Sequence, residues 1–267
     1  MPELPEVELT RRRLEREITG KMIAQVAVRV PKLRTPVPPE LAACLTGQAI
    51  RFVNRRGKYL LLGCDAGWLI VHLGMTGFLR LLPQPAQPGK HDHFDLVFTD
   101  GSVLRFHDPR KFGTIAWTTG PPEAHPLLAD IGPEPLTAAF DGAYLFRVSR
   151  TRRVAVKLLI MNMHLVAGVG NIYANEALFR AGVRPDRAAA SLSRSECERL
   201  ADTIRQVLQE SIDQGSTYRV AEETVAYHPL DFAVYGRGDA TCTGCNRPLV
   251  ATRLGNRSTV YCPRCQQ

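Results

Sequence analysis

The sequence lacks any apolar run long enough to span a bilayer, and its N-terminus lacks the basic-then-apolar pattern of a signal peptide. It also has no internal repeats and no low-complexity tract. These absences argue against a membrane-spanning or exported protein and against a repeat architecture. We therefore expect a folded protein of the cytosol with no membrane partner.

Acidic residues are fewer than basic ones, since 26 Asp and Glu stand against 34 Lys and Arg, for a formal net charge of +8. A basic excess suggests an anionic polymer as partner, although a basic surface that serves only solubility is an open alternative. The chain of 267 residues is long enough for two domains and an appended small module. Its hydrophobic content of 45% supports a core.

Cysteine is sparse outside the C-terminal region, where four of the seven cysteines form the pattern C-x2-C, sixteen residues, C-x2-C. This spacing predicts one structural zinc ion, because four thiolates fill its tetrahedral coordination. A redox pair or disulfides are the alternatives, and a reducing compartment disfavours both. The predicted ligands are Cys242, Cys245, Cys262 and Cys265. We interpret the scattered Cys44, Cys64 and Cys197 as ordinary reduced thiols.

The segment between the two cysteine pairs alternates like a β-hairpin, with Gly255-Asn256 as its turn. So small a module cannot hold a core alone, and metal binding would supply its folding energy. Its arginines fit contact with phosphates, although a zinc ribbon could equally bind protein.

The first helix is expected to begin at Pro5 and to end near Gly20. Short, alternating, β-branched segments follow from residue 23 to residue 119 and predict a β-sandwich or barrel. A stretch rich in proline and glycine, residues 120–138, is interpreted as a connection between domains. Helical periodicity then dominates from about 140 to 215, where Ser193 and Glu196 form a capping box before an apolar stripe.

The opening residues "MPELPEVE" combine proline and acids. Removal of Met1 would leave Pro2 as a secondary amine, which can attack an aldehyde carbon and form an iminium ion. Glu3 and Glu6 would then lie beside a reactive amine and could serve in acid–base steps. The alternative is an ordinary helix start, in which acids favour the positive end of the helix dipole.

Four further segments carry candidate residues, each with an ordinary structural alternative. In "RRGKYLL", Lys58 could donate a proton or hold a phosphate, or be a solvated turn lysine. In "HLGMTG", Met75 could wedge between bases or belong to the core. In "HDPRKFG", Arg110 and Phe112 suit phosphate contact and stacking, or a salt-bridged turn. The segment "GVGN" opens a helix whose N-terminus could attract a phosphate, although this signal is weak alone.

Together these segments resemble the family of bacterial formamidopyrimidine-DNA glycosylase, the 8-oxoguanine repair enzyme often called Fpg. The resemblance covers nearly the whole chain. It depends on "PELPEVE", "RRGKYLL", "HLGMTG", "HDPRKFG", "GVGNIYANEALFRAG", "VYGR" and the C-terminal cysteine module, which occur in the family's order.

The resemblance implies an enzyme that flips a damaged base out of double-stranded DNA, removes it, and cleaves the resulting abasic site by β,δ-elimination. It implies Pro2 as nucleophile, Glu3 as acid, Lys58 as proton donor for β-elimination, and Arg257 as a phosphate contact that assists δ-elimination. The implied DNA-binding residues are Glu6, Met75, His91, Arg110, Phe112, Arg152, Lys157 and Asn171. The implied lesion loop includes Ser216, Thr217, Tyr218 and Arg219.

The implied fold is α+β and multidomain. A leading helix and β-sandwich would occupy residues 1–130, and a connection residues 131–150. A helix–two-turns–helix DNA-binding domain, with a lesion loop at 215–235, would span residues 151–234, and a β-hairpin zinc finger residues 235–267. We expect a monomer in the bacterial cytosol.

The sister family, endonuclease VIII, prefers oxidised pyrimidines, and its N-terminus usually begins Pro-Glu-Gly, where this chain has Pro-Glu-Leu. A lesion preference of that kind is one alternative, and a catalytically idle DNA-binding protein on the same scaffold is another. Retention of Pro2, Glu3 and Lys58 argues against the idle protein.

The chain departs from the family pattern at three places. Lys111 replaces an arginine and Asn162 replaces an aspartate; the first keeps its charge and is expected to have a small effect. The family's longer Gly-rich loop corresponds here to a shorter segment without glycine between Gly215 and Gly236. We therefore expect ring-opened purines to be handled better than 8-oxoguanine.

Overall fold

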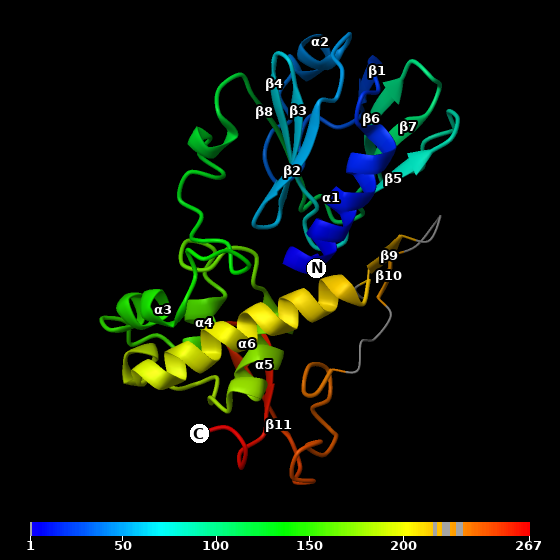
Figure 1. Cartoon of the computed structure of the whole chain (residues 1–267). Coiled ribbons are helices and arrows are strands. Elements are labelled where there is room, and N and C mark those ends of the chain that lie inside the picture. The colour runs from blue at the N-terminus through cyan, green and yellow to red at the C-terminus, as the bar shows by residue number, and fades with distance from the viewer. Residues whose placement is uncertain (1, 216–217, 221–224, 228–231) are drawn as a thin grey trace. The chain divides into compact units, whose positions relative to one another are not determined.

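The computed structural model describes residues 2–215, 218–220, 225–227 and 232–267. The chain divides into two compact units, residues 1–129 with 217–228 and residues 130–216 with 229–267. The first unit holds a long helix and two four-stranded sheets, and the second holds most of the remaining helices and the C-terminal hairpin (Figure 1). Within the described part of the chain, no helix is both long and apolar enough to cross a membrane.

Helix α1 (Leu4–Ile18) carries the N-terminal motif. Proline lies in its first turn, where a missing N–H costs nothing. Its buried face includes Val7, Leu14 and Ile18, which recur at the helical period. The helix predicted from Pro5 to near Gly20 is confirmed to within two residues.

Two antiparallel sheets make up the rest of the first unit, with strand orders β2-β3-β4-β8 and β1-β6-β7-β5. The strands of the first sheet are β2 (Phe52–Arg56), β3 (Tyr59–Cys64), β4 (Gly67–His72) and β8 (Thr114–Thr118). The strands of the second are β1 (Ile23–Val28), β5 (Phe78–Leu82), β6 (Asp92–Phe98) and β7 (Val103–His107). Seven of these strands lie within segments that alternation predicted, and β6 begins one residue before its predicted segment, which starts at His93.

One apolar cluster joins the two sheets. It includes four fully buried side chains, Leu60 and Leu62 of β3, Leu96 of β6 and Phe106 of β7. Inward-facing residues of both sheets therefore form a single core, and the predicted β-sandwich is confirmed. Helix α2 (Leu41–Leu45), which the sequence analysis did not predict, adds two leucines to this core.

The second unit contains helices α3 (Gly142–Ser149), α4 (Val156–Ile160), α5 (Asn171–Ala181) and α6 (Arg194–Asp213). The predicted capping box of α6 is confirmed, because Ser193 Oγ accepts the Glu196 N–H at 3.2 Å and Glu196 accepts the Ser193 N–H at 2.8 Å. Helix α3 lies within the stretch assigned to the interdomain connection, yet it packs on α6. Gly142 permits the close approach, since a Cβ there would lie 2.4 Å from the Cα of Glu198.

Strands β11 (Val250–Leu254) and β12 (Arg257–Tyr261) form the C-terminal hairpin. Gly255 and Asn256 have φ values of +54° and +61°, which are the left-handed conformations that a type I′ turn requires. The predicted turn is therefore confirmed. A third short pair, β9 (Tyr218–Val220) and β10 (Val225–Tyr227), is antiparallel and belongs to the first unit. Two 3-10 turns, η1 (Pro122–Ala124) and η2 (Ala189–Ser191), complete the described elements.

Candidate active site and nucleic-acid interface

The backbone after Pro2 is held by a buried carboxylate. Glu3 is the N-cap of α1 and is 1% exposed. Its backbone N–H donates to Glu6 Oε2 at 2.7 Å, and Glu6 is itself fully buried. Since this N–H belongs to the peptide unit that joins Pro2 to Glu3, the side chain of Glu6 orients the residue predicted to be the nucleophile.

Lys58 lies in the two-residue turn between β2 and β3. Gly57 has a φ of +56° at the first central position of this turn, as a type II′ turn requires. Across the sheet, Tyr59 pairs with His72. Burial, with the charges of Lys58 and Arg34, lowers the pKa of His72 to about 4.

The neutral imidazole of His72 accepts a hydrogen bond from a neighbouring loop. Its Nδ1 accepts the backbone N–H of Gly74 at 3.0 Å and so holds the loop that carries Met75. An imidazolium could not accept this hydrogen bond. Gly74 has a φ of +71°, and a Cβ there would lie 2.6 Å from both Phe112 C and Gly113 N. The structure therefore brings the loops of Met75 and Phe112 into contact, as their predicted joint role requires.

At the exposed tip of the Phe112 loop, a guanidinium group lies against an aromatic ring. The Arg110 guanidinium lies 4.5 Å from the centre of the Phe112 ring, which is 42% exposed. Lys111, between them, has a left-handed φ of +54°. This arrangement leaves an aromatic face and a fixed positive charge together at the surface.

Asp108 organises this loop, and the sequence analysis did not single it out. It is fully buried, and its carboxylate accepts the Gly113 N–H at 2.7 Å and the Arg110 N–H at 3.3 Å. The Thr76 hydroxyl, from the Met75 loop, lies 3.4 Å from the same carboxylate. An aspartate directly before proline in a turn was the available sequence signal.

His91 is half-buried beside two other histidines. Its ring centre lies 5.8 Å from that of His107 and 6.4 Å from that of His93. His107 Nδ1 lies 2.7 Å from Oδ1 of the buried Asp92. The contact of His91 with a DNA backbone stays a prediction.

In the second unit, Ser258 of the hairpin connects two predicted DNA contacts. Lys157 is fully buried, and its ammonium donates to Ser258 O and to Thr259 Oγ1, both at 2.7 Å. Asn171, at the start of α5, donates from Nδ2 to Ser258 Oγ at 3.1 Å. Arg257, the residue before Ser258 in the hairpin, is exposed. Lys157 thus holds the hairpin on the helices, and its phosphate contact stays a prediction.

The remaining DNA and lesion candidates are less informative. Arg152 is half-buried beyond the end of α3 and donates to the Val148 carbonyl. Ser216 and Thr217 lie outside the described residues. The backbone of Tyr218 and Arg219 belongs to β9, paired with β10.

The four C-terminal cysteines form a cluster that fits a metal ion. Their Sγ atoms all lie within 4.8 Å of one another. The Cys242–Cys265 and Cys245–Cys262 Sγ separations are 3.9 and 3.5 Å. Four thiolates at about 2.3 Å from a tetrahedral zinc would lie about 3.8 Å apart. The cluster therefore has the ligand number, type and spacing to hold one metal ion.

A further residue that the sequence analysis missed is Glu176 on α5. Its carboxylate is buried and accepts three successive backbone N–H groups, those of Ala233, Val234 and Tyr235, at 2.8–2.9 Å. This contact fixes the segment that enters the cysteine module. No local pattern could have found it, because its partners lie more than fifty residues away.

Comparison with known proteins agrees with this geometry. Residues 1–115 match the formamidopyrimidine-DNA glycosylase N-terminal domain, and residues 131–222 match the H2TH domain of the same family. The chain is 80% identical to the formamidopyrimidine-DNA glycosylase of Pelobacter propionicus and 75% identical to that of Geobacter metallireducens, with full coverage of both chains in each case. The chain belongs to the formamidopyrimidine-DNA glycosylase family.

Solved structures of this family share the fold. The MutM (Fpg) protein of Thermus thermophilus is 40% identical, with a TM-score of 0.88 over 99% of this chain and 98% of its own. The Lactococcus lactis Fpg in complex with DNA containing an abasic site is 34% identical, with a TM-score of 0.91 over 99% of both chains. The same bacterium's Fpg has also been solved with DNA containing N7-benzyl-Fapy-dG.

Proposed function

We propose that the protein is a bifunctional DNA glycosylase and abasic-site lyase of base-excision repair, acting on oxidised purines in double-stranded DNA. The observation that carries the proposal is the hydrogen bond from Glu3 N–H to Glu6, which fixes the peptide unit after Pro2. A nucleophile at a chain end gains most from such support, because orientation lowers the entropic cost of attack.

The proposed reaction begins once Met1 is removed. The Pro2 nitrogen attacks the sugar C1′, and the bond between C1′ and the damaged base breaks as the base departs with the bonding electrons. The Pro2 nitrogen then loses its proton, and the C1′–O4′ bond of the sugar opens as O4′ takes a proton from Glu3 and the nitrogen forms a double bond to C1′. The resulting iminium ion draws electrons from C2′, so that a proton leaves C2′ and the bond to the 3′ phosphate breaks. Lys58 is the proton donor in this β-elimination, and Arg257 assists the later departure of the 5′ phosphate.

The surface loops supply the proposed DNA contacts. Met75, Arg110 and Phe112 fill the space left by the extruded base, and an exposed ring with an adjacent guanidinium suits stacking and base-edge contact. His91, Arg152, Lys157 and Asn171 hold the backbone. Residues 215–235 contact the extruded lesion. The comparison structures, which hold DNA with an abasic site and with N7-benzyl-Fapy-dG, support damaged DNA as the ligand.

We propose zinc as the ion held by Cys242, Cys245, Cys262 and Cys265. When bound, it stabilises the hairpin and takes no part in the chemistry, because four protein ligands leave no position open for water. The hairpin in turn presents Arg257.

Borohydride trapping tests the proposal, because borohydride reduces an iminium to a stable protein–DNA adduct. The duplexes contain an abasic site, 8-oxoguanine or a formamidopyrimidine, and Pro2→Gly is the control variant. We expect adducts with the wild-type protein and none with Pro2→Gly. Absence of an adduct on every duplex, from protein whose intact mass shows that Met1 is gone, would contradict the enzymatic function.

A further inference from the structure

We infer that Glu8 and Arg55 are positioning residues that link the helix bearing the nucleophile to the turn bearing Lys58. Neither residue belongs to the site described above. The inference depends on the proposed function, since it assigns these residues to the elimination step.

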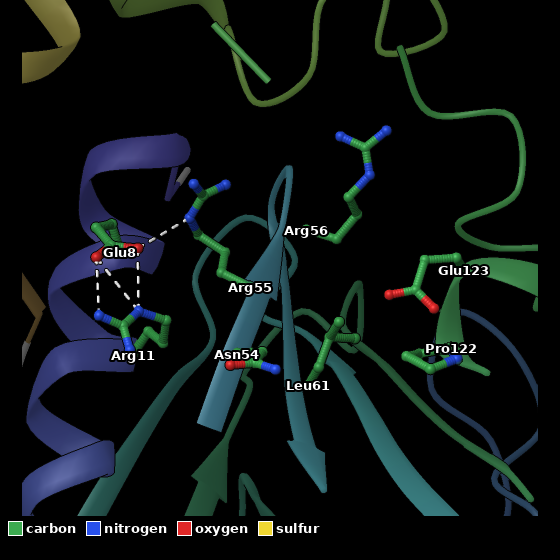
Figure 2. A pocket seen from close by; sticks show the side chains of 8 residues that line it. All are labelled: Glu8, Arg11, Asn54, Arg55, Arg56, Leu61, Pro122 and Glu123. Carbon is green, nitrogen blue, oxygen red and sulfur yellow. Dashed lines mark hydrogen bonds and ion pairs between the residues drawn. The ribbon is translucent and has the colours of Figure 1, made fainter. Parts of the chain in front are cut away.

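Arg55 bridges the two elements directly. Its Nε donates to Glu8 Oε2 on α1 at 3.1 Å, and its Nη1 donates to the carbonyl oxygen of Gly57 at 2.9 Å. Both side chains are largely buried, at 11% and 13% exposed. Figure 2 shows Arg55 reaching toward Glu8, whereas Arg56, the next residue of β2, points away from it. One guanidinium thus contacts both the helix and the turn.

Glu8 is a fixed acceptor. Arg11 and Arg12, on the same helix, also donate to its carboxylate, with nitrogen–oxygen distances of 2.9–3.2 Å. Burial alone would raise the pKa of Glu8, but the hydrogen bonds from Arg11, Arg12 and Arg55 hold it below its ordinary value. Glu8 therefore stays ionised throughout the neutral range and keeps its hold on Arg55.

The Gly57 carbonyl, which accepts the Arg55 hydrogen bond, controls the direction of the Lys58 side chain. It belongs to the peptide unit between Gly57 and Lys58, at the centre of a turn with only two residues between paired strands. A rotation of this peptide would swing the Cα–Cβ bond of Lys58. The turn type alone limits this peptide to a narrow range of orientations but leaves its carbonyl oxygen to solvent. The Arg55 contact at 2.9 Å narrows this range further at the residue that must deliver a proton.

The arrangement has a chemical consequence. Pro2 directly precedes Glu3, the N-cap of α1, and Lys58 lies in the turn that Arg55 links to α1. Attack by Pro2 needs only the orientation of the helix start. Elimination needs Lys58 at the departing phosphate oxygen while the iminium is still attached to Pro2. The Glu8–Arg55 link therefore serves the second step and not the first.

Single-turnover kinetics on abasic-site DNA separate the two steps. Borohydride trapping measures iminium formation, and strand cleavage measures elimination. For Arg55→Gln we expect elimination to slow roughly tenfold to hundredfold, as a misplacement of about 1 Å can cause, while iminium formation changes less than about twofold. Glu8→Gln should act in the same direction, and it serves as the second variant if Arg55→Gln folds poorly.

Arg13→Gln is the matched control. It removes the same charge from the same unit, but Arg13 forms its ion pair with Glu17 on the same helix and is 39% exposed. Both rates should remain at the wild-type level in this variant.

A double-mutant cycle with Lys58→Ala distinguishes positioning from general destabilisation. If Arg55 acts through Lys58, Arg55→Gln will cause no further loss of elimination in the Lys58→Ala background. Equal losses in both steps, a full additional loss in that background, or rates equal to those of Arg13→Gln would each overturn the inference. Failure of the wild-type protein to form an adduct would instead overturn the proposed function.

Discussion

The carboxylate of Glu6 accepts the N–H of Glu3 at 2.7 Å, and the peptide unit held in this way is the one that follows Pro2. Loss of the acceptor should leave helix α1 intact and loosen the nucleophile. We predict that Glu6→Ala slows iminium formation on abasic-site DNA about tenfold or more, because the N–H loses its charged partner.

Borohydride trapping measures this rate. The control is Glu17→Ala on the same helix, which removes an exposed partner of Arg13. If Glu6→Ala and Glu17→Ala trap at the same rate, Glu6 does not orient Pro2.

The elements that could be predicted from sequence are those with local physical causes. The alternation of β2 to β8, the Ser193–Glu196 capping box and the Gly255-Asn256 turn each depend on residues close together in the chain. The cysteine cluster was likewise predictable, because metal geometry restricts ligand spacing.

The elements that escaped prediction depend on distant partners. The helical periodicity that begins near residue 140 predicted α3 as a helix, but its packing on α6 was not predicted. Lys157 was expected at the DNA backbone, yet it is fully buried, and its ammonium donates hydrogen bonds to Ser258 O and Thr259 Oγ1. Asp108 accepts a backbone N–H of its own loop. The aspartate–proline turn pattern could have identified it, but the sequence analysis did not use that pattern.

The low pKa of His72 predicts how the protein responds to acid. Its folded-state pKa, about 4, lies below the ordinary value of 6.5, so the unfolded chain binds a proton that the folded chain does not. His72 therefore contributes stability that is present above pH 6.5 and is lost as the pH falls from 6.5 through 4. We expect its ring resonances to stay unchanged between pH 8 and about 5.

NMR titration measures this directly, with His72→Gln assigning the resonances. The same variant should flatten the dependence of unfolding free energy on pH in that interval. A midpoint near 6.5 for His72 would show that burial and the charges of Lys58 and Arg34 do not lower its pKa.

Glu176 should contribute strongly to the unfolding free energy of the second unit. Removing its carboxylate in Glu176→Ala leaves three buried or half-buried backbone N–H groups without their charged acceptor. We predict a loss of about 3 kcal/mol or more in unfolding free energy. Glu176→Gln keeps one acceptor oxygen and should lose less. Chemical denaturation measures both, and the exposed Glu210→Gln is expected to change stability by less than about 0.5 kcal/mol.

Metal removal should affect the hairpin before the sandwich. If the four cysteines hold zinc, chelation should unfold the module and abolish DNA binding, while the cooperative unfolding of residues 1–129 persists. Elemental analysis should find one zinc per chain, and Cys245→Ser should reduce it. Full DNA affinity in a metal-free preparation would contradict the assignment, because Arg257 depends on the hairpin for its position.

The segment after α6 predicts a lesion preference. Between Gly215 and Gly236 it contains no glycine, and residues 218–220 and 225–227 of it form the β9–β10 pair. Glycine is the residue that lets a loop wrap closely around a ligand, so a loop without it should enclose an extruded base less completely. We expect excision of ring-opened purines to depend less on such enclosure than excision of 8-oxoguanine does.

We therefore predict faster excision of formamidopyrimidines than of 8-oxoguanine under single-turnover conditions, with equal cleavage of preformed abasic sites as the control. Excision of 8-oxoguanine at least as fast as that of formamidopyrimidines would show that Gly-rich closure is not what recognises the lesion here.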